Sequence, residues 1–591
     1  MEDALTLVGT EAPRPQVVRY AIGPVSFEWI DGGLHAIRYG DAEMISAITF
    51  PVRDRDWGTL VPRLSALSEK RAEGALRLRW TATWSSGCAT LTADLSVEAG
   101  PQGLTVLGRG RSDGAFETNR AGFTVLHPVG ASGCPAVVEH SDGTETRGAL
   151  PTLIEPWQPF MDIRALTHVR SGATIACRME GDTFEMEDQR QWSDASFKTY
   201  NRPLAKPWPY RIAAGEVLEQ SVTLTFSGPV PVARNASDIA VRVGVPTGTI
   251  VPELALVLDA AGAREADPGL LARIAPHRIA CHAERGDDLS AFARLAALGA
   301  RLDLDYAASC DGDLGAEFAE LADQVASAGL DLASLFVCPS VDRRSTPPGS
   351  DWPDCPPLEQ IHAAAARAFP DLPRGGGMLS YFTEFNRKRP PVGMLDFVAH
   401  GTNPIVHDAA DRSVMQTLTA IPWILRSGKA IAGDVPYRLG LSSIPMRQNP
   451  YGSRVMENPD DGRICMAGSD PRHRARFGAA FTLGYLAAIA PFGVAVWTPA
   501  AGAGPAGVDG PGVDGADGLS PLGALLADLA PLAGRHVRKV EVTDPERVAA
   551  LCAGDELWLA NLTEAEIVVA LGDRRLTVAP YGTLRVAASS S

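Results

Sequence analysis

The chain has 591 residues, a formal net charge of −16, 45% hydrophobic residues and 21% charged residues. This is ordinary globular composition, and the length allows about three or four domains, or fewer if one of them is a barrel. The acidic balance excludes a protein that tracks phosphates or lies on an anionic membrane, because both need a basic surface. It favours a small neutral substrate, with neither nucleic acid nor membrane as partner, and it is compatible with a homo-oligomer.

The N-terminal segment, the lack of a long apolar run and the cysteines together predict a cytoplasmic protein. The first 16 residues are polar and contain Glu2, Asp3 and Glu11, so we expect no signal peptide. No run of about 18 apolar residues follows, so we expect no transmembrane helix. The cysteines form no CxxC pair, which is typical of reduced thiols and disfavours zinc fingers and disulfide frameworks. They lie at positions 88, 134, 177, 281, 310, 338, 355, 465 and 552. We expect no metal and no cofactor.

The first part of the chain has the pattern of strands. Between residues 17 and 230, apolar and polar side chains alternate at a period of two, and clusters of Gly, Pro, Asp and Ser separate the runs. We therefore predict an N-terminal antiparallel β-sandwich over residues 1–235. One short helix is a candidate at 60–70. The clearest strand candidates are 17–22, 76–84, 89–97, 104–110 and 217–226.

From about residue 236, short apolar runs alternate with amphipathic helical stretches. Eight such strand-then-helix units match a (β/α)8 TIM-type barrel over residues 236–534. An open doubly wound sheet is the competing topology, but the glycine-rich nucleotide motifs of that fold are missing from the expected places. The predicted strands are 254–259, 278–282, 301–306, 335–338, 376–382, 397–399, 430–433 and 492–497.

The last part of the chain returns to strands. Residues 501–518 are low-complexity and Gly-rich, and we interpret them as a loop on the C-terminal face of the barrel, either a plain insertion or a substrate lid. Period-two patterns at 537–542, 556–561, 566–571 and 583–586 predict a small C-terminal β-sandwich over residues 535–591. The whole chain is thus a multidomain protein, α/β in the middle and β at both ends.

A TIM barrel carries its active site at the C-terminal ends of its strands, so polar residues there are candidates. Glu384, Asn386, Arg387 and Lys388 follow the fifth predicted strand. Glu384 is a candidate general acid, base or nucleophile, because adjacent cations can hold it ionised or bind substrate oxygens. The alternative interpretation is a structural ion pair.

The sixth predicted strand leads into His400, Asn403, His407 and Asp408. His407 beside Asp408 suits a base or a group that orients a substrate hydroxyl. The spacing matches no strong metal motif. The alternative for Asp408 is a helix cap. After the seventh predicted strand, two further substrate-binding candidates are Asp434 and Arg447.

The most unusual stretch lies in the N-terminal domain. Five carboxylates fall between positions 180 and 188, and on a strand Glu187 would face the side opposite to Met186. Acids and cations around an aromatic face suit a sugar-like ligand, although a solvated acidic loop is the alternative. We take Glu187 as a catalytic candidate. The substrate-binding candidates are Arg190, Trp192, Asp194, Lys198 and Tyr200. Glu117, Thr118, Asn119, Arg120 and His127 form a smaller polar cluster upstream.

Several segments resemble the D-apionate lactonase family of bacterial apiose catabolism. In the N-terminal domain these are GFTVLHP, WQPFMDIRALTH and MEGDTFEMEDQRQWSDASFKTYNRPLAKPWPY. In the barrel they are FTEFNRKRP, HGTNPIVHDAADRSVMQTL and SSIPMRQNPYG. The three-part layout agrees, so the resemblance covers nearly the whole chain. It implies hydrolysis of a five-membered sugar lactone, D-apionolactone, to its open aldonate by carboxylate-assisted attack of water.

The chemistry needs a base for water, a donor for the oxyanion and an acid for the leaving alkoxide. On chemical grounds Glu384 serves as base or acid, with Arg387, Lys388 or Asn386 as the donor. Glu187 and Asp194 bind hydroxyls or act as the second acid/base, and His400 and His407 are reserve bases. The absence of a GxSxG sequence disfavours a serine esterase.

Two other functions stay open. A TIM-barrel glycoside hydrolase would use a pair of carboxylates, such as Glu384 with Glu187 or Asp434. The fourth predicted strand ends without a carboxylate, which departs from many barrel glycosidases. A non-catalytic carbohydrate-binding protein would instead have a shallow surface with solvated carboxylates.

Overall fold

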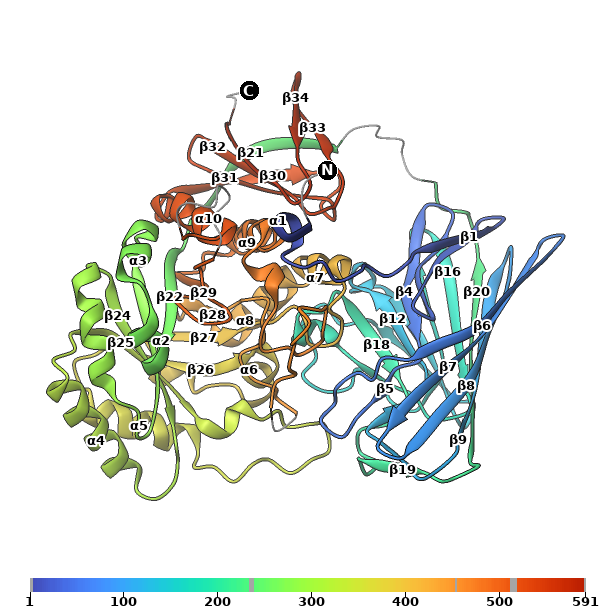
Figure 1. Cartoon of the computed structure of the whole chain (residues 1–591), viewed down its shortest axis with the longest axis horizontal. Helices are drawn as coiled ribbons and strands as arrows, with labels where there is room; N and C mark the ends of the chain where they lie inside the picture. Colours follow the sequence, from blue (N-terminus) through green and yellow to red (C-terminus); the bar gives the residue numbers. More distant parts are fainter. Residues whose placement is uncertain (1–3, 233–238, 452–453, 511–517, 589–591) are drawn as a thin grey trace.

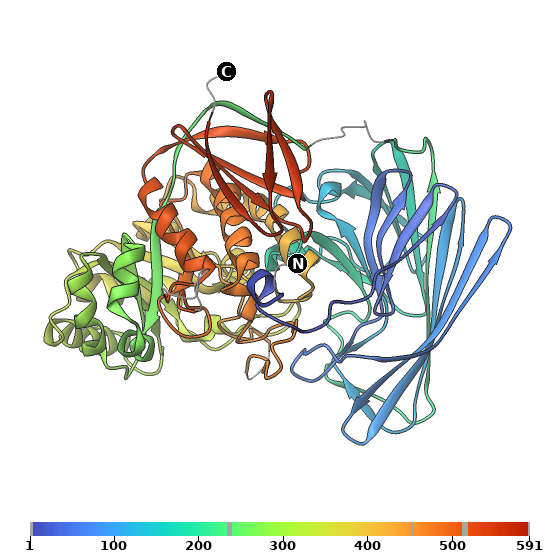
Figure 2. The same ribbon diagram turned by 45° about the horizontal axis from the view of Figure 1, so that its top comes forward.

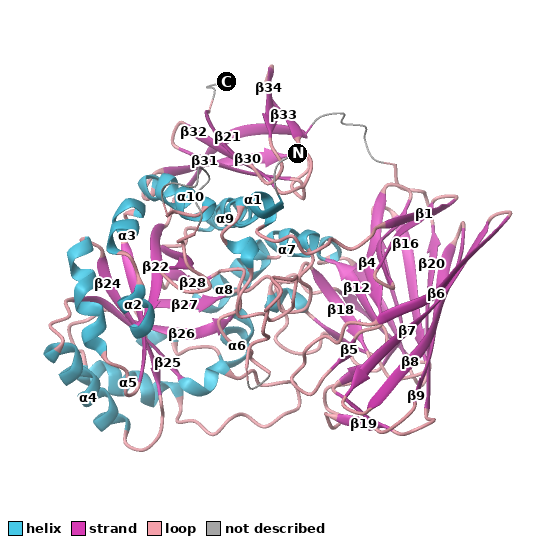
Figure 3. Ribbon diagram, viewed as in Figure 1, coloured by secondary structure: helices cyan, strands magenta, loops and turns pink. Residues whose placement is uncertain are grey.

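The computed structural model describes residues 4–232, 239–451, 454–510 and 518–588. A closed barrel, a large sheet-rich domain beside it and a small sheet over its helices make up the molecule (Figures 1 and 2). Helices concentrate around the barrel, and strands make up both ends of the chain (Figure 3). The predicted multidomain architecture is therefore confirmed.

Two large antiparallel sheets form the N-terminal domain. The seven-stranded sheet has the order β1-β2-β3-β4-β12-β18-β17, and the nine-stranded sheet has the order β14-β13-β15-β16-β20-β9-β8-β7-β6. The first comprises β1 (Val18–Ile22), β2 (Val25–Ile30), β3 (Gly33–Tyr39), β4 (Ala42–Thr49), β12 (Thr124–Pro128), β17 (Glu185–Glu187) and β18 (Ser196–Tyr200). The second comprises β6 (Arg63–Ala72), β7 (Ala75–Ser86), β8 (Ala89–Gly100), β9 (Gly103–Ser112), β13 (Pro135–His140), β14 (Glu145–Ala149), β15 (Ile163–Arg170), β16 (Ala173–Glu180) and β20 (Val217–Ser227).

Alternating side chains pack these two sheets face to face. Along β7 nearly every second residue is buried, as a strand with one face on the core requires. Trp29 and Trp80 meet edge to face with ring centroids 6.1 Å apart, and each comes from a different sheet. The predicted helix at 60–70 is wrong, because most of that segment forms strand β6. Its outward side chains are exposed, so its apolar spacing did not mark a buried helix face.

The barrel is closed by eight parallel strands, so the open-sheet alternative is excluded. The predicted seventh strand at 430–433 is wrong: these residues end helix α8 (Ile421–Ala432), and the seventh strand follows after the turn. A short apolar run does not by itself distinguish a helix end from a strand. The strands are β22 (Glu253–Asp259), β23 (Arg278–Glu284), β24 (Arg301–Ala308), β25 (Leu332–Pro339), β26 (Arg374–Tyr381), β27 (Phe397–Gly401), β28 (Tyr437–Leu441) and β29 (Val496–Ala501).

Helices cover the outside of this barrel. Strand β22 is buried through most of its length, as expected for a parallel strand with a packed interior on one side and helices on the other. The other α-helices of the described barrel region are α2 (Ala260–Glu265), α3 (Pro268–Ile274), α4 (Leu314–Ser327), α5 (Leu358–Ala368), α6 (Phe382–Lys388), α7 (Asp411–Gln416), α9 (Arg476–Ile489) and α10 (Pro521–Leu529).

A seven-stranded sheet closes the molecule at the C-terminal end. One of its strands, β21 (Ile239–Ile250), comes from the beginning of the predicted barrel region and pairs with β30 and β33. The sheet packs on helix α9, which is apolar on nearly all sides and therefore lies between the barrel and this sheet. The remaining strands are β30 (His536–Val542), β31 (Val548–Ala553), β32 (Glu556–Asn561), β33 (Ile567–Leu571), β34 (Arg574–Val578) and β35 (Thr583–Ala587).

Part of the Gly-rich segment packs on the barrel. The Arg474 guanidinium donates to the carbonyl of Gly504 at 2.5 Å and to the Asp509 carboxylate at 2.9 Å. Residues 511–517, where we placed a candidate lid, lie outside the described residues. No helix in the described part of the chain is long and apolar enough to cross a membrane.

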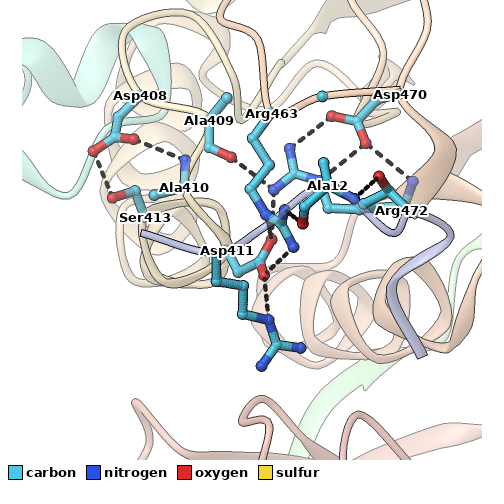
Figure 4. Close-up of polar contacts among 12 residues, drawn as sticks. Ala12, Asp408, Ala409, Ala410, Asp411, Ser413, Arg463, Asp470 and Arg472 are labelled. Carbon is cyan, nitrogen blue, oxygen red and sulfur yellow. Dashed lines mark hydrogen bonds and ion pairs between the residues drawn. The ribbon is translucent and has the colours of Figure 1, made fainter. Parts of the chain in front are cut away.

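A buried ionic network ties the loop before α7 to the loop before α9 (Figure 4). The fully buried Arg472 donates to Asp470 at 2.6 Å and to Asp411 at 2.8 Å. Arg463 binds the same Asp411 carboxylate at 2.8 Å. Arg472 thus neutralises two carboxylates that have little access to water.

Replacing Arg472 by Met should destabilise the protein strongly. Removing one partner of a buried ion pair costs about 3–5 kcal/mol, because the remaining charge stays desolvated. Thermal unfolding should show a clearly lower midpoint for Arg472→Met than for Arg367→Met, which alters an exposed arginine on α5. Equal midpoints for the two variants would contradict this account of the network.

Candidate active site

Helix α6 is the place where the N-terminal domain docks on the barrel. It follows β26 directly, so its side chains lie at the C-terminal end of the barrel. Thr383 donates to the carbonyl of Gln191 at 3.0 Å, and Asn386 donates to the carbonyl of Ile154 at 3.1 Å. Arg387 adds a bond to the carbonyl of Pro156 at 3.2 Å. The sandwich is therefore fixed over this side of the barrel by buried polar contacts.

A cavity lies where the two domains meet. The sandwich contributes most of its polar walls, and the barrel loops after β27 and β28 contribute the rest. The residues that line it are Arg53, Trp57, Arg120, Glu187, Lys198, Leu204, Val406, His407, Tyr451 and Met466. Three cations, one carboxylate, one imidazole and two aromatic rings thus face a single space.

A histidine and an aspartate from different domains form a pair at this cavity. His407 Nδ1 lies 2.7 Å from Asp194 Oδ2, and both side chains are largely buried. With the proton on Nδ1, the other ring nitrogen keeps a free lone pair. Burial lowers the pKa of His407 well below its usual value, and the nearby cations Lys198, Arg53 and Arg120 lower it further, while burial raises the pKa of Asp194 well above its usual value. The imidazole is therefore neutral at neutral pH, as a base must be.

Glu187 is held as an ion-pair partner. Its carboxylate lies 2.5 Å from the Lys198 ammonium and accepts a hydrogen bond of 2.8 Å from Trp192 Nε1. Although burial acts to raise the pKa of Glu187, Lys198 and then Arg120 hold it below its usual value. Glu187 therefore stays ionised and fixes the ammonium group at the wall of the cavity.

Arg120 is the cation with the fewest polar partners. Its guanidinium lies over the Tyr200 ring at 4.1 Å and near the Trp57 ring at 5.3 Å. Its buried Nε has no hydrogen-bond partner among the described residues. Arg53, by contrast, donates a hydrogen bond to the carbonyl of Trp57 at 3.2 Å. A stacked guanidinium with donors to spare suits a ligand that carries a negative or partly negative oxygen.

The structure places Glu384 outside this cavity. It is fully buried and accepts from Ser345 Oγ at 2.7 Å and from the Thr346 amide at 3.1 Å. Arg387 and Lys388 lie 3.3 Å and 3.4 Å from its carboxylate oxygens. This geometry matches the alternative interpretation, a structural ion network, which here stiffens the docking helix.

Two other residues of the N-terminal cluster have structural partners. Arg190 is fully buried and forms a bidentate pair with Asp188, at 2.8 Å and 2.6 Å. Tyr200 donates to Glu185 at 2.5 Å, and its ring supports Arg120. Tyr200 therefore supports the cavity wall through Arg120, whereas Arg190 neutralises the buried Asp188.

Three of the candidate residues on the barrel, His400, Asn403 and Arg447, have different surroundings. Both ring nitrogens of His400 are engaged, with the carbonyl of Gly401 and the hydroxyl of Tyr437. Asn403 donates to three backbone carbonyls of the loop after β28 and therefore holds that loop in place. Arg447 lines a separate space at the mouth of the barrel.

Asp408 and Asp434 are placed elsewhere. Asp408 accepts from the Ala410 amide and from Ser413 Oγ, as the capping alternative implies (Figure 4). The predicted position of Asp434 on the C-terminal face is wrong. It is exposed and precedes β28, so it lies at the opposite end of the barrel from the cavity. This error follows from the misplaced seventh strand.

Sequence reasoning did not select four charged or aromatic lining residues as site residues: Arg53, Trp57, Arg120 and Tyr451. The signal that could have marked the first two is a crowd of charges beside a tryptophan between strands, the same signal that marked the 180–200 stretch. In the described part of the chain, no group of three or more His, Cys, Asp or Glu side chains is arranged to hold a metal ion.

Replacing Glu384 by Gln should lower stability, because it leaves Arg387 and Lys388 without their buried counter-charge, at a cost of about 3–5 kcal/mol. Thermal unfolding and limited proteolysis near residues 150–160 would measure the loss of docking. Glu359→Gln, on the exposed side of α5, is the matched control. A Glu384→Gln protein that unfolds like the wild type but does not turn over substrate would instead place Glu384 in the reaction.

Comparisons with known proteins agree across the whole chain. Residues 5–229, 253–534 and 545–586 match the family models described as D-apionate lactonase N-terminal domain, TIM barrel domain and C-terminal immunoglobulin-like domain. A D-apionate lactonase from Brucella anthropi is 43% identical over 598 residues, which is 98% of each chain.

Among solved structures, a GH51 arabinofuranosidase from Xanthomonas axonopodis pv. citri is 11% identical, over 57% of this chain and 88% of its own, with a TM-score of 0.38. A putative aldose 1-epimerase from Escherichia coli K12 is 11% identical, over 36% of this chain and 100% of its own, with a TM-score of 0.26. From the three domain models and the full-length relative, the chain belongs to the D-apionate lactonase family.

Proposed function

We propose that this protein hydrolyses the five-membered ring of D-apionolactone to the open acid, in the cavity between the sandwich and the barrel. The observation that carries the site assignment is the Asp194–His407 pair, which faces a space lined by three cations. Membership of the lactonase family supports the reaction class. A cytoplasmic location is also proposed, in keeping with nine cysteines that all carry free thiols.

His407 acts as the general base. A water proton moves to its free ring nitrogen while the water oxygen attacks the lactone carbonyl carbon. Asp194 holds the Nδ1 proton, fixes the ring and stabilises the imidazolium that forms. The imidazolium then returns the proton to the ring oxygen as the carbon–oxygen bond breaks. The resulting carboxylic acid ionises and releases one proton to solvent.

Arg120 and Lys198 supply the electrostatic part of the reaction. Negative charge develops on the carbonyl oxygen in the tetrahedral intermediate, and preorganised donors in a site with little water stabilise it strongly. The lining contains three cationic side chains and one carboxylate, Glu187, so its net charge is positive. The same excess favours the carboxylate of the product. Trp57 and Tyr451 offer flat apolar faces for the C–H side of the sugar ring.

A glycoside hydrolase is less well supported. That chemistry needs two carboxyl groups facing each other across the bond, about 5–10 Å apart. Among the described residues that line the cavity, the carboxylate is Glu187, and it is paired with Lys198. The fourth strand, β25, ends in Cys338 and Pro339 and is followed by Ser340, and none of these three residues carries a carboxylate.

Loss of the base should abolish most of the activity. For His407→Gln, kcat/KM on D-apionolactone should fall about 10²- to 10⁴-fold, since general-base catalysis contributes that much. Acid release followed with a pH indicator, above spontaneous ring opening, measures it. His536→Gln changes an exposed histidine on β30 and should leave the rate unchanged. Wild-type activity in a folded His407→Gln protein would rule out this base, and aryl glycosides would be the substrates to try next.

The pH profile should report the lowered pKa of His407. The base works when neutral, so kcat/KM should fall only as the pH drops through that pKa, below the usual histidine value of about 6.5. In Lys198→Met a cation is lost, so the acid limb should move to higher pH while the rate falls. Lys539→Met, on the exposed face of β30, should keep the wild-type profile. An acid limb that stays in place in Lys198→Met would contradict this coupling.

A further inference from the structure

The interior of the barrel contains one carboxylate whose charge is fully matched. Asp303 receives two hydrogen bonds from Arg278, at 2.8 Å and 3.0 Å, and one from Ser334 at 2.6 Å. Arg438 lies 3.6 Å from its other side. This ionic layer needs no ligand.

Asp305, two residues further along β24, is in a different situation. It faces the same side of the strand as Asp303, one layer nearer the C-terminal mouth. Among the described residues, no hydrogen bond or ion pair to its carboxylate is found within 4.0 Å, and the side chain lines a cavity at the mouth of the barrel. Burial raises the pKa of Asp305 to about 7, against the opposing effect of Arg447. A carboxyl group without a protein partner at a cavity wall can accept hydrogen bonds from a bound molecule.

The barrel-mouth cavity has a second polar wall and apolar sides. Arg447 and Thr498 line it opposite the strand that carries Asp305, while Phe336 and Met378 supply apolar surface. A neighbouring space shares Arg447 and adds hydroxyl and amide groups. Its polar lining residues are Ser380, Tyr381, Thr402, Asn403, Ser443 and Gln448. The combined lining therefore brings hydrogen-bonding groups and apolar surface to the same space.

The barrel-mouth cavity is distinct from the candidate active site. The two have no lining residue in common. Trp192 and Tyr381 pack between them with ring centroids 5.8 Å apart. Val406, Met446 and Met466 complete the apolar layer. A ligand in one cavity therefore does not touch the walls of the other.

We propose that the barrel-mouth cavity is a second binding site, which takes a small neutral molecule bearing several hydroxyl groups, such as a polyol or a cyclic sugar derivative. Asp305 accepts hydrogen bonds from the hydroxyls, and Arg447 donates to a ring or carbonyl oxygen. When Asp305 is ionised, one anion faces one cation, and no net charge is left to attract an ionic ligand. Phe336 covers the C–H face of the molecule. This site goes beyond the proposed hydrolysis and does not depend on it.

The test uses 1,4-anhydroerythritol, a neutral cyclic diol without a hydrolysable bond, in a ligand-observed NMR titration of the full chain. Asp305→Asn and Asp305→Leu should weaken its binding about tenfold or more, as expected when a hydrogen bond to a charged group is lost. Asp434→Asn, which alters an exposed acid at the other end of the barrel, should bind like the wild type. Arg120→Met, in the interdomain cavity, should keep the barrel-mouth binding.

Three outcomes would overturn the proposal. Equal affinities in the Asp305 and Asp434 variants would show that Asp305 holds no ligand. Loss of all binding in Arg120→Met would leave the interdomain cavity as the one site for such molecules. Loss of lactone hydrolysis in a folded Asp305→Asn protein, with hydrolysis retained in His407→Gln, would move the reaction to the barrel mouth and reject both assignments. The two assignments are supported together if His407→Gln loses hydrolysis while Asp305→Asn keeps it, and if only the Asp305 variants bind 1,4-anhydroerythritol more weakly.

Discussion

The candidate active site depends on the contact between two domains that are far apart in the sequence. Asp194 belongs to the sandwich and His407 to the barrel, and their side chains meet at 2.7 Å. Neither domain by itself could orient the imidazole. The buried network around α6, in which Glu384 pairs with Arg387 and Lys388, fixes the docking that this geometry requires. Glu384, a catalytic candidate from the sequence, thus lies in an ion network at the domain contact and does not line the interdomain cavity.

Burial and charge then determine what the cavity can do. The walls bring Arg53, Arg120 and Lys198 close together, and each of these cations disfavours a proton on His407. The cluster therefore keeps the base neutral and offers donors to a developing oxyanion at the same time. Glu187 offsets one of the three charges through its 2.5 Å pair with Lys198. The remaining positive charge matches a reaction that begins with a neutral ring and ends with a carboxylate.

The barrel itself is used differently from many barrels of its kind. In the barrel interior, Asp303 is hydrogen-bonded to Arg278. Both ring nitrogens of His400 are also hydrogen-bonded to other parts of the protein. The mouth keeps Asp305 and Arg447 facing an open space. The interdomain cavity and the barrel-mouth cavity are two separate polar cavities, and the Trp192 and Tyr381 rings pack between them.

The amino-acid sequence by itself determined the domain order, the barrel class and the stretches that carry polar side chains. Period-two alternation and strand–helix repeats are local, and so is the crowd of acids before Trp192, because each depends on neighbours along the chain. The strand at 430–433 failed for the same reason, since a short apolar run has no distinctive period. The tertiary structure decided which polar groups face a cavity. Glu384 and Glu187 both precede basic residues in the sequence. In the folded protein, domain docking encloses Glu384 in a buried ion network and places Glu187 beside Lys198 at the wall of the cavity. Arg120 became a site residue only because distant strands bring it beside His407, a long-range contact that local patterns do not encode.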